Sequence, residues 1–321
     1  MLRLTKYFFY ISLFAAITCC SKSNSDVLKY INPFIGTGAH GHTFPGPTRP
    51  FGMVQIGPDT RIEGWDGCSG YHYSDSIIYG FSHTHLSGTG IGDYCDLLIM
   101  PFSGELTFNN GYNDNNELCY SSLFDKKNET AKAGFYEVVL SKHQITAKLT
   151  CTDRVGIHKY TYKNPQDARL IIDLEHRDKL LDWNLSINED NQLTGSRISS
   201  SWANKQFFYF CMDFSSDYHI EYNNTNAPTK AVITFKNLEK DELMVKVGIS
   251  TVSEENAKNN LMHEASHWDF NQYRLEAEDS WRKEMDKIQI ETNHDSIKTI
   301  FYTSLYHSAI APNLISDVDG S

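Results

Sequence analysis

The chain has 321 residues, of which 40% are hydrophobic and 21% are charged, a balance that excludes a disordered or fibrous protein. Asp and Glu outnumber Lys and Arg by 40 to 29, which gives a formal net charge of -11, and no run of basic residues is present. Because such a chain would repel a phosphate backbone, we expect no nucleic-acid partner.

The first 19 residues have the layout of a secretory signal peptide. Arg3 and Lys6 precede an apolar stretch at 7–17 that is too short to span a membrane. Cys19, Cys20 and a polar run follow, and this pattern resembles the lipidation site of bacterial lipoproteins. We therefore expect export and a lipid anchor on Cys20, or on Cys19, in the bacterial envelope, either in the periplasm or at the outer-membrane surface. An ordinary signal peptide cleaved nearby is the alternative.

Residues 30–101 are crowded with Gly, Pro, His and aromatic residues, which excludes a long helix and predicts structured loops over strands. Loops of this kind often carry function. The segment contains three dense motifs: INPFIGTGAHGHTFPGPTRPFGMVQIGPDT, GWDGCSGYHYSD and GFSHTHLSGTGIGDYCDLLIMP.

The second motif places an indole, Trp65, beside a carboxylate, Asp66, among glycines that allow sharp turns. A sugar presents apolar C–H faces and a rim of hydroxyls, so an aromatic ring flanked by polar groups suits it. Trp65 could equally fill the core while the glycines shape turns, and these residues alone do not separate the two interpretations.

Two His-x-His pairs, His40 with His42 and His83 with His85, raise the hypothesis of a transition-metal site. Residues two apart on an extended segment point to the same side, so each pair offers two imidazoles to one ligand. Only Asp93 and Asp96 are available as loose further ligands. Histidines that form hydrogen bonds in a polar cleft are therefore the favoured interpretation, and a His-dependent metallohydrolase is a minor hypothesis.

Residues 134–250 predict an antiparallel β-sandwich, because short runs rich in β-branched and aromatic residues alternate with Asn, Asp, Gly and Pro clusters. The runs are FYEVVLS, QITAKLTCT, GIHKYTY, ARLIIDL, FFYFCMDF, KAVITF and LMVKVGIS. The cysteines beyond the leader have no CxxC spacing, and at most one or two disulfides are expected among them.

Helical periodicity begins after Ser253, which is a suitable N-cap because Glu254 and Glu255 follow it. One face of a single helix or of two consecutive helices is predicted to carry Ala257, Leu261, Ala265, Trp268, Tyr273, Ala277, Trp281 and Met285. A further amphipathic helix follows Asn293, with an apolar face that includes Ile297, Ile300 and Phe301, and ends before Pro312. This face needs a partner surface, so we expect a truncated product. A complete protein is the alternative.

Hydrolysis of a glycosidic bond usually needs two carboxylates, and acidic residues are plentiful in this chain, but their spacing selects no pair. No G-x-S-x-G elbow, P-loop or dinucleotide-binding motif is present.

The three motifs in this order resemble the amino-terminal part of glycoside hydrolase family 92, the exo-acting α-mannosidases of the Bacteroidetes type, and FYTSLYHSAIAPNLISDVDGS resembles the segment that opens its second domain. The resemblance implies a mainly β fold, with an antiparallel β-sandwich of the galactose-mutarotase-like or supersandwich type. Linker helices and the first helix of a truncated (α/α)6 barrel would follow. The implied boundaries are a signal peptide at 1–19, the sandwich at 20–252, the linker at 253–292 and the barrel start at 293–321.

The same resemblance implies substrate-binding roles. Trp65 matches the aromatic residue near the leaving-group sugar, Asp66, Gly67 and Cys68 line the same loop, and His83 and His85 support or border the pocket. Asp317 and Asp319 belong to a motif at the barrel mouth. The resemblance also implies a calcium ion. Its main ligands, the catalytic acid and the catalytic base match no residue of this chain, so no catalytic residue is assigned.

We therefore expect the amino-terminal, carbohydrate-binding part of a calcium-dependent α-1,2-mannosidase. The parent protein would remove terminal mannose from glycoprotein glycans with inversion, and this chain would be inactive alone. The expected partners are mannose-containing glycans and, through the lipid anchor, a membrane. The alternative is a surface lipoprotein that binds glycans without hydrolysing them.

Overall fold

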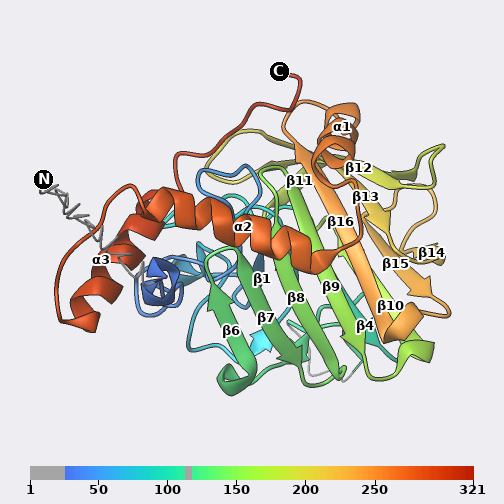
Figure 1. Cartoon of the computed structure of the whole chain (residues 1–321). Coiled ribbons are helices and arrows are strands. Elements are labelled where there is room, and N and C mark those ends of the chain that lie inside the picture. Colours follow the sequence, from blue (N-terminus) through green and yellow to red (C-terminus); the bar gives the residue numbers. More distant parts are fainter. Residues whose placement is uncertain (1–25, 113–117) are drawn as a thin grey trace, which may run out of the picture.

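The computed structural model describes residues 26–112 and 118–321, and these residues form mainly antiparallel β-structure with three α-helices (Figure 1). The expected signal peptide and Cys20 lie outside the described residues. Among the described helices, none has the length and apolar character needed to cross a membrane.

The larger sheet has eight antiparallel strands. Side chains along it alternate between buried and half-buried, as in β7, where Tyr136, Val138 and Leu140 point into the core. In spatial order the strands are β11 (Lys179–Ile187), β12 (Leu193–Ser200), β13 (Gln206–Phe214), β16 (Glu242–Ser250), β9 (Val155–Tyr162), β8 (Ile145–Cys151), β7 (Phe135–Leu140) and β6 (Glu129–Lys132).

The smaller sheet has six strands and shares one hydrophobic core with the larger sheet. Leu170 and Ile172 on β10 and Val245 and Val247 on β16 belong to this common core. The order is β1 (Gly57–Asp59), β3 (Gly80–Ser82), β4 (Leu98–Ser103), β10 (Ala168–Asp173), β15 (Lys230–Phe235) and β14 (Tyr218–Tyr222). A separate pair joins β2 (Ile77–Ile78) to β5 (Ser122–Leu123). The prediction of antiparallel strands is confirmed for the runs named above.

Within residues 134–250, three strands, β11, β12 and β14, were missing from the prediction. β11 and β14 each lie at one edge of their sheet, and Leu185 of β11 is the one buried side chain of these two strands. Their apolar pattern is therefore weak, and pairing with their neighbours stabilises them instead.

Helix α1 (Glu254–Glu264) packs on the outer face of β16. The predicted cap is confirmed, since Ser253 Oγ accepts a hydrogen bond of 3.1 Å from the Asn256 amide. At Gly248 a side chain would clash, because a Cβ there would lie 2.4 Å from the carbonyl oxygen of Ala257. This close approach requires glycine on the strand.

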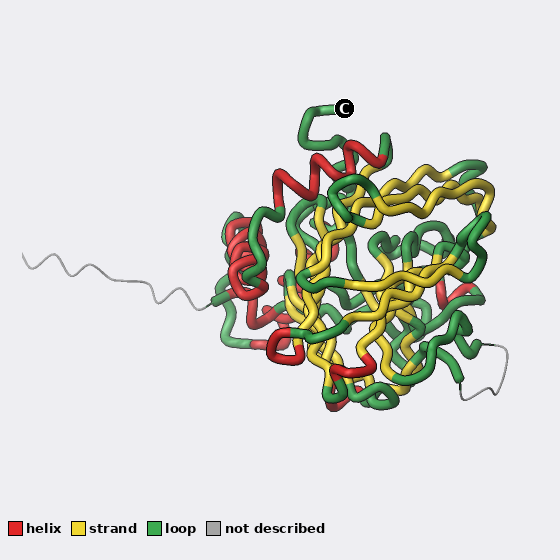
Figure 2. Tube along the Cα trace, turned by 90° about the vertical axis from the view of Figure 1, so that its right-hand side faces the viewer, coloured by secondary structure: helices red, strands yellow, loops and turns green. Residues whose placement is uncertain are grey.

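The predicted helical stretch is broken into α1 and α2 (Phe270–Met285), and Trp268 lies in the break with 39% of its surface exposed. Trp268 is therefore not part of the buried helical face. Helix α2 crosses the outside of the larger sheet over β7, β8 and β9 (Figure 1), and Figure 2 shows the helices on the outside of the strand layers.

Helix α3 (Asp295–Ser308) contributes Tyr302 and Tyr306 to a second core formed with Trp281 and the segment around Tyr30. The apolar face predicted from periodicity is confirmed in part, because Phe301 packs against this core whereas Ile297 is 49% and Ile300 is 64% exposed. Within the described chain no element covers Ile297 and Ile300.

Candidate functional site

Trp65 lies on an exposed turn between loops of the smaller sheet. Gly64 has φ of +86°, a conformation that favours glycine, and Trp65–Gly67 form a short 3-10 turn after it. The indole is 58% exposed, so the interpretation that Trp65 fills the core is wrong. An exposed indole on a turn provides a flat apolar surface at the edge of the sheet.

Two histidines of the first motif surround this indole. The His40 and His42 rings lie 5.2 Å and 4.3 Å from the Trp65 ring, centroid to centroid. Both also contact one carboxylate oxygen, Asp66 Oδ1, at 2.7 Å from His40 Nδ1 and 3.3 Å from His42 Nε2. The hydrogen bond from His40 is the main cause that holds the pKa of Asp66 below its usual value.

The third motif packs against the same ring. A Cβ on Gly90 would lie 2.3 Å from the indole nitrogen of Trp65, so this loop passes directly against the ring. The amide of Gly88 also donates a 2.7 Å hydrogen bond to the carbonyl of His42. The structure therefore brings the three motifs together around Trp65.

Arg177, which no sequence pattern singled out, holds the Trp65 loop. Its guanidinium donates to the carbonyls of Arg61, at 2.8 Å, and Ile62, at 3.2 Å, and also to the carbonyl of Gly67. These carbonyls flank the turn on both sides, so one planar fork fixes the backbone that presents the indole.

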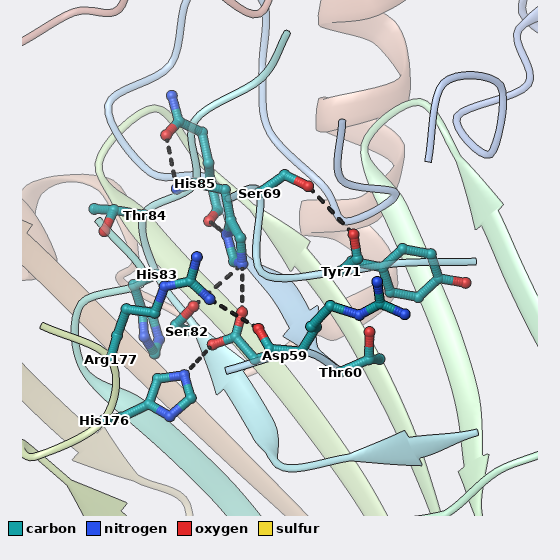
Figure 3. Close-up of polar contacts among 12 residues, drawn as sticks. Asp59, Thr60, Ser69, Tyr71, Ser82, His83, Thr84, His85, His176 and Arg177 are labelled. Carbon is teal, nitrogen blue, oxygen red and sulfur yellow. Dashed lines mark hydrogen bonds and ion pairs between the residues drawn. The ribbon is translucent and has the colours of Figure 1, made fainter. Parts of the chain in front are cut away.

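The residue before Arg177 joins a buried polar cluster under the loop (Figure 3). Asp59 accepts from His85 Nε2 at 3.0 Å and from His176 Nε2 at 2.8 Å, and all three side chains are almost completely buried. Burial alone would raise the pKa of Asp59, but the charges and hydrogen bonds of His176 and His85 lower it far below its usual value. His85 Nδ1 also lies 2.8 Å from the carbonyl oxygen of Gln55.

His83 lies apart from His85 in a neutral relay. His83 Nδ1 donates to the Leu97 carbonyl at 2.9 Å, and its Nε2 lies 3.0 Å from His158 Nε2. Tyr160 donates to His158 Nδ1 at 2.8 Å. Burial is the main cause that lowers the pKa of His83 to about 4. His83 and His85 therefore do not converge on one ligand.

The remaining predicted residues occupy different positions. Gly67 and Cys68 are buried beneath the Trp65 turn, and burial raises the pKa of the Cys68 thiol. Asp317 accepts from Ser250, Asn256 and Asn260 at 2.6, 2.9 and 2.6 Å, whereas Asp319 is exposed and is hydrogen-bonded to Ser321. These two carboxylates contact α1 and the end of β16, and no described contact joins them to Trp65.

A metal site can be tested against the donors that are present. One group of three donors occurs among the described residues, Asp59, His85 and Cys95, whose ligand atoms lie within 4.8 Å of one another. Calcium prefers six to eight oxygen ligands, so a group with one carboxylate, one imidazole and one thiol does not fit it. Asp93 and Asp96 are occupied elsewhere, by the backbone of residues 202–203 and by Arg197.

The five described cysteines, Cys68, Cys95, Cys119, Cys151 and Cys211, are free thiols. A mostly apolar cavity of about 300 Å³ lies where β13 and β16 meet residues 313–315. It shares no lining residue with the Trp65 turn.

Two family models match the chain. Residues 30–250 match the model of the glycosyl hydrolase family 92 N-terminal domain, and residues 256–321 match that of the family 92 catalytic domain. An uncharacterized secreted glycosidase of Arthroderma benhamiae is 24% identical over 334 residues, which is 89% of this chain and 42% of that protein.

Solved structures of the same family superpose closely. The family GH92 alpha-mannosidase BT3965 from Bacteroides thetaiotaomicron is 32% identical with a TM-score of 0.85, over 92% of this chain and 42% of that one. It has also been solved in complex with mannoimidazole. The inverting mannosidase BT2199 from the same species is 24% identical with a TM-score of 0.79, over 94% and 42% of the two chains, and this similarity is one of fold. The chain thus spans about 42% of the length of these relatives.

Proposed function

The chain belongs to glycosyl hydrolase family 92, and from that membership we propose that it forms the sugar-binding wall of an α-mannosidase whose substrate is a mannose-terminated glycan. The Trp65 turn supports this proposal most strongly. The indole of Trp65 is exposed and lies beside the Asp66 carboxylate, which two imidazoles contact. Such an indole can stack on a hexose, and the carboxylate can accept hydrogen bonds from the hydroxyls of the sugar. In this proposal Trp65 contacts the C–H face of mannose and Asp66 accepts from a hydroxyl.

The supporting roles follow from the contacts beneath the turn. Arg177 and the Asp59 cluster with His85 would keep the indole in place and reduce the entropy lost when a sugar binds. Gly67 and Cys68 would shape the turn, His83 would border the pocket from below, and Asp317 and Asp319 would lie at the entrance of the second domain.

We assign the proton transfers to parts of a longer protein. The family resemblance implies that a Glu and an Asp of the catalytic barrel act as acid and base in an inverting reaction on α-1,2-linked mannose. Calcium would likewise be held by oxygen ligands outside the described residues. The 321-residue chain alone is therefore proposed to bind mannosides without hydrolysing them.

The finer assignment of the fold and of the location is also a proposal. The sandwich would be of the galactose-mutarotase-like type at 20–252, with a helical linker at 253–292 and the first barrel helix, α3, at 293–321. The exposed Ile297 and Ile300 on α3 support the idea that further helices pack there. The secreted relative supports export, and a lipid anchor on Cys20 would hold the protein in the envelope.

Calorimetric titration of the chain with α-1,2-linked mannobiose tests the proposal. We expect binding that Trp65→Ala weakens by about tenfold, the loss of one aromatic contact, while Trp65→Phe keeps part of it. Because Trp65 is exposed, the melting temperature should hardly change. An unchanged affinity in Trp65→Ala would overturn the proposed role, and release of mannose by the wild-type chain in calcium buffer would overturn the assignment of catalysis to other segments.

A further inference from the structure

A second pocket adjoins the Trp65 turn at Gly64. Its volume is about 290 Å³, and its walls come from four segments that are far apart in the sequence. Gly64 precedes the Trp65 turn, Gly92 belongs to the third motif, Asp178 follows Arg177, and Ser201 begins the turn between β12 and β13. We call this the outer pocket.

The backbone of Trp202, the neighbour of Ser201, is held by hydrogen bonds although its side chain is exposed. Its side chain is 77% exposed, the largest fraction among the large hydrophobic residues described. Asp93, which is only 7% exposed, accepts from the amides of Trp202 at 2.8 Å and Ala203 at 3.0 Å. A buried carboxylate thus fixes the backbone of a turn that presents an indole to solvent. Such a turn loses little conformational entropy when a ligand binds.

Asp178 supplies an incompletely satisfied polar group in the wall of the outer pocket. Its Oδ2 is buried and has no hydrogen-bond partner among the described residues. A buried acceptor without a partner costs free energy that a donor from a ligand can recover. Burial is the main cause that raises the pKa of Asp178 to about 7.

The chemistry of the wall favours a ligand with several hydroxyls. The side chains of Asp178, Lys179, Ser200 and Ser201 offer hydrogen-bond donors and acceptors. Arg177 already donates to the carbonyls of the Trp65 loop. Together with an indole on the adjoining turn, this set matches a hexose, which combines hydroxyls with an apolar face.

We propose that the outer pocket and Trp202 form a second sugar subsite, which binds a hexose of the glycan beyond the disaccharide unit held at Trp65. This proposal rests on the proposed function, because the two subsites share the wall that begins at Gly64. A linear oligosaccharide would occupy both, and a disaccharide would occupy only the Trp65 subsite.

Titrations of the full chain with linear α-linked mannobiose and mannotetraose separate the two subsites. We expect the wild-type chain to bind mannotetraose more tightly than mannobiose. Trp202→Ala should weaken mannotetraose binding by about tenfold and leave mannobiose binding unchanged. Trp202→Phe should keep part of the difference in affinity between mannotetraose and mannobiose. Asp178→Ala should reduce this difference. Trp268→Phe, which replaces a half-exposed indole outside the pocket, is the control and should bind both ligands as the wild type does.

The outcomes distinguish this proposal from the proposed function. Equal mannotetraose affinities in the wild type, Trp202→Ala and Asp178→Ala would overturn the second subsite, although mannobiose binding at Trp65 would stand. Failure of the wild type to bind either ligand, or a Trp65→Ala variant with unchanged mannobiose affinity, would overturn the proposed function and the second subsite with it.

Discussion

Arg177 stabilises the Trp65 turn without being predictable from any local pattern. It lies more than a hundred positions beyond the turn in the sequence, and its partners are backbone carbonyls, which every residue carries. Only the fold reveals such a contact. Trp65 and Asp66, in contrast, are visible in the sequence because an aromatic residue, a carboxylate and glycines occur side by side.

The substitution Arg177→Lys tests whether the planar guanidinium of Arg177 positions the indole of Trp65. Lysine keeps the charge but cannot donate to several carbonyls in one plane, so we expect mannobiose affinity to fall by about tenfold. The free energy of unfolding should fall by only about 1–3 kcal/mol, the loss of one or two hydrogen bonds. Lys236→Ala, an exposed change on another surface, should alter neither quantity. Wild-type affinity in Arg177→Lys would show that the loop does not need the fork.

The relay from Tyr160 through His158 to His83 predicts a pH effect on stability. His83 keeps a pKa of about 4 in the folded chain against 6.5 for an ordinary histidine, mainly because of burial. As the pH falls below 6.5, the unfolded chain binds a proton that the folded chain does not, so stability decreases until the pH reaches about 4. The contribution of this group amounts to about 3 kcal/mol.

Urea unfolding at several pH values between neutral and the folded pKa measures this effect. His83→Gln, which keeps hydrogen-bonding groups but does not titrate, should show a shallower fall, with the remainder supplied by His158, whose pKa burial also lowers. Identical pH slopes in the wild type and His83→Gln would contradict the assignment of a neutral His83.

At the scale of elements, the docking of α1 on β16 depends on the absence of a side chain at Gly248. A Cβ there would lie 2.4 Å from the Ala257 carbonyl oxygen and 2.7 Å from Leu261 Cβ, so the helix must move outward. We expect Gly248→Ala to lower the free energy of unfolding by about 1–3 kcal/mol, as overpacking does. Gly38→Ala, where the new Cβ would meet only Tyr73 Cβ at 3.7 Å, is the matched control. Equal stability of the two variants in denaturant titrations would contradict this packing.

The strands that the sequence predicted differ from those that it missed in the strength of their apolar pattern. Central strands such as β7 and β9 have apolar side chains facing the shared core, so composition and alternation predict them. β11 and β14 lie at sheet edges, and β12 is rich in Ser and Thr, so hydrogen bonding to their neighbours decides their conformation. In α3, periodicity located the helix correctly but its buried side only in part, because Phe301 packs inward beside Tyr302 while Ile300 stays exposed.

For the whole molecule, the fold brings together motifs that local reasoning describes only one at a time. His40 precedes β1, Trp65 follows it and Gly90 lies between β3 and β4, and the fold brings these three segments together. Local physical chemistry predicted loops and an aromatic residue suited to sugars, but not their convergence, which depends on contacts between distant segments. The resemblance of the ordered motifs predicted the family, and the match over residues 30–250 confirms it.

The central claim is that a mannoside binds on the Trp65 indole, and nuclear magnetic resonance of the labelled chain tests it most directly. The chain has five tryptophans, and the indole N–H signal of Trp65 can be assigned by its loss in Trp65→Phe. Titration with α-1,2-linked mannobiose should shift the Trp65 signal progressively and leave that of Trp281, which is fully buried in the second core, in place. The claim would be contradicted if mannobiose bound while the Trp65 signal stayed in place, or if only the signals of other indoles shifted.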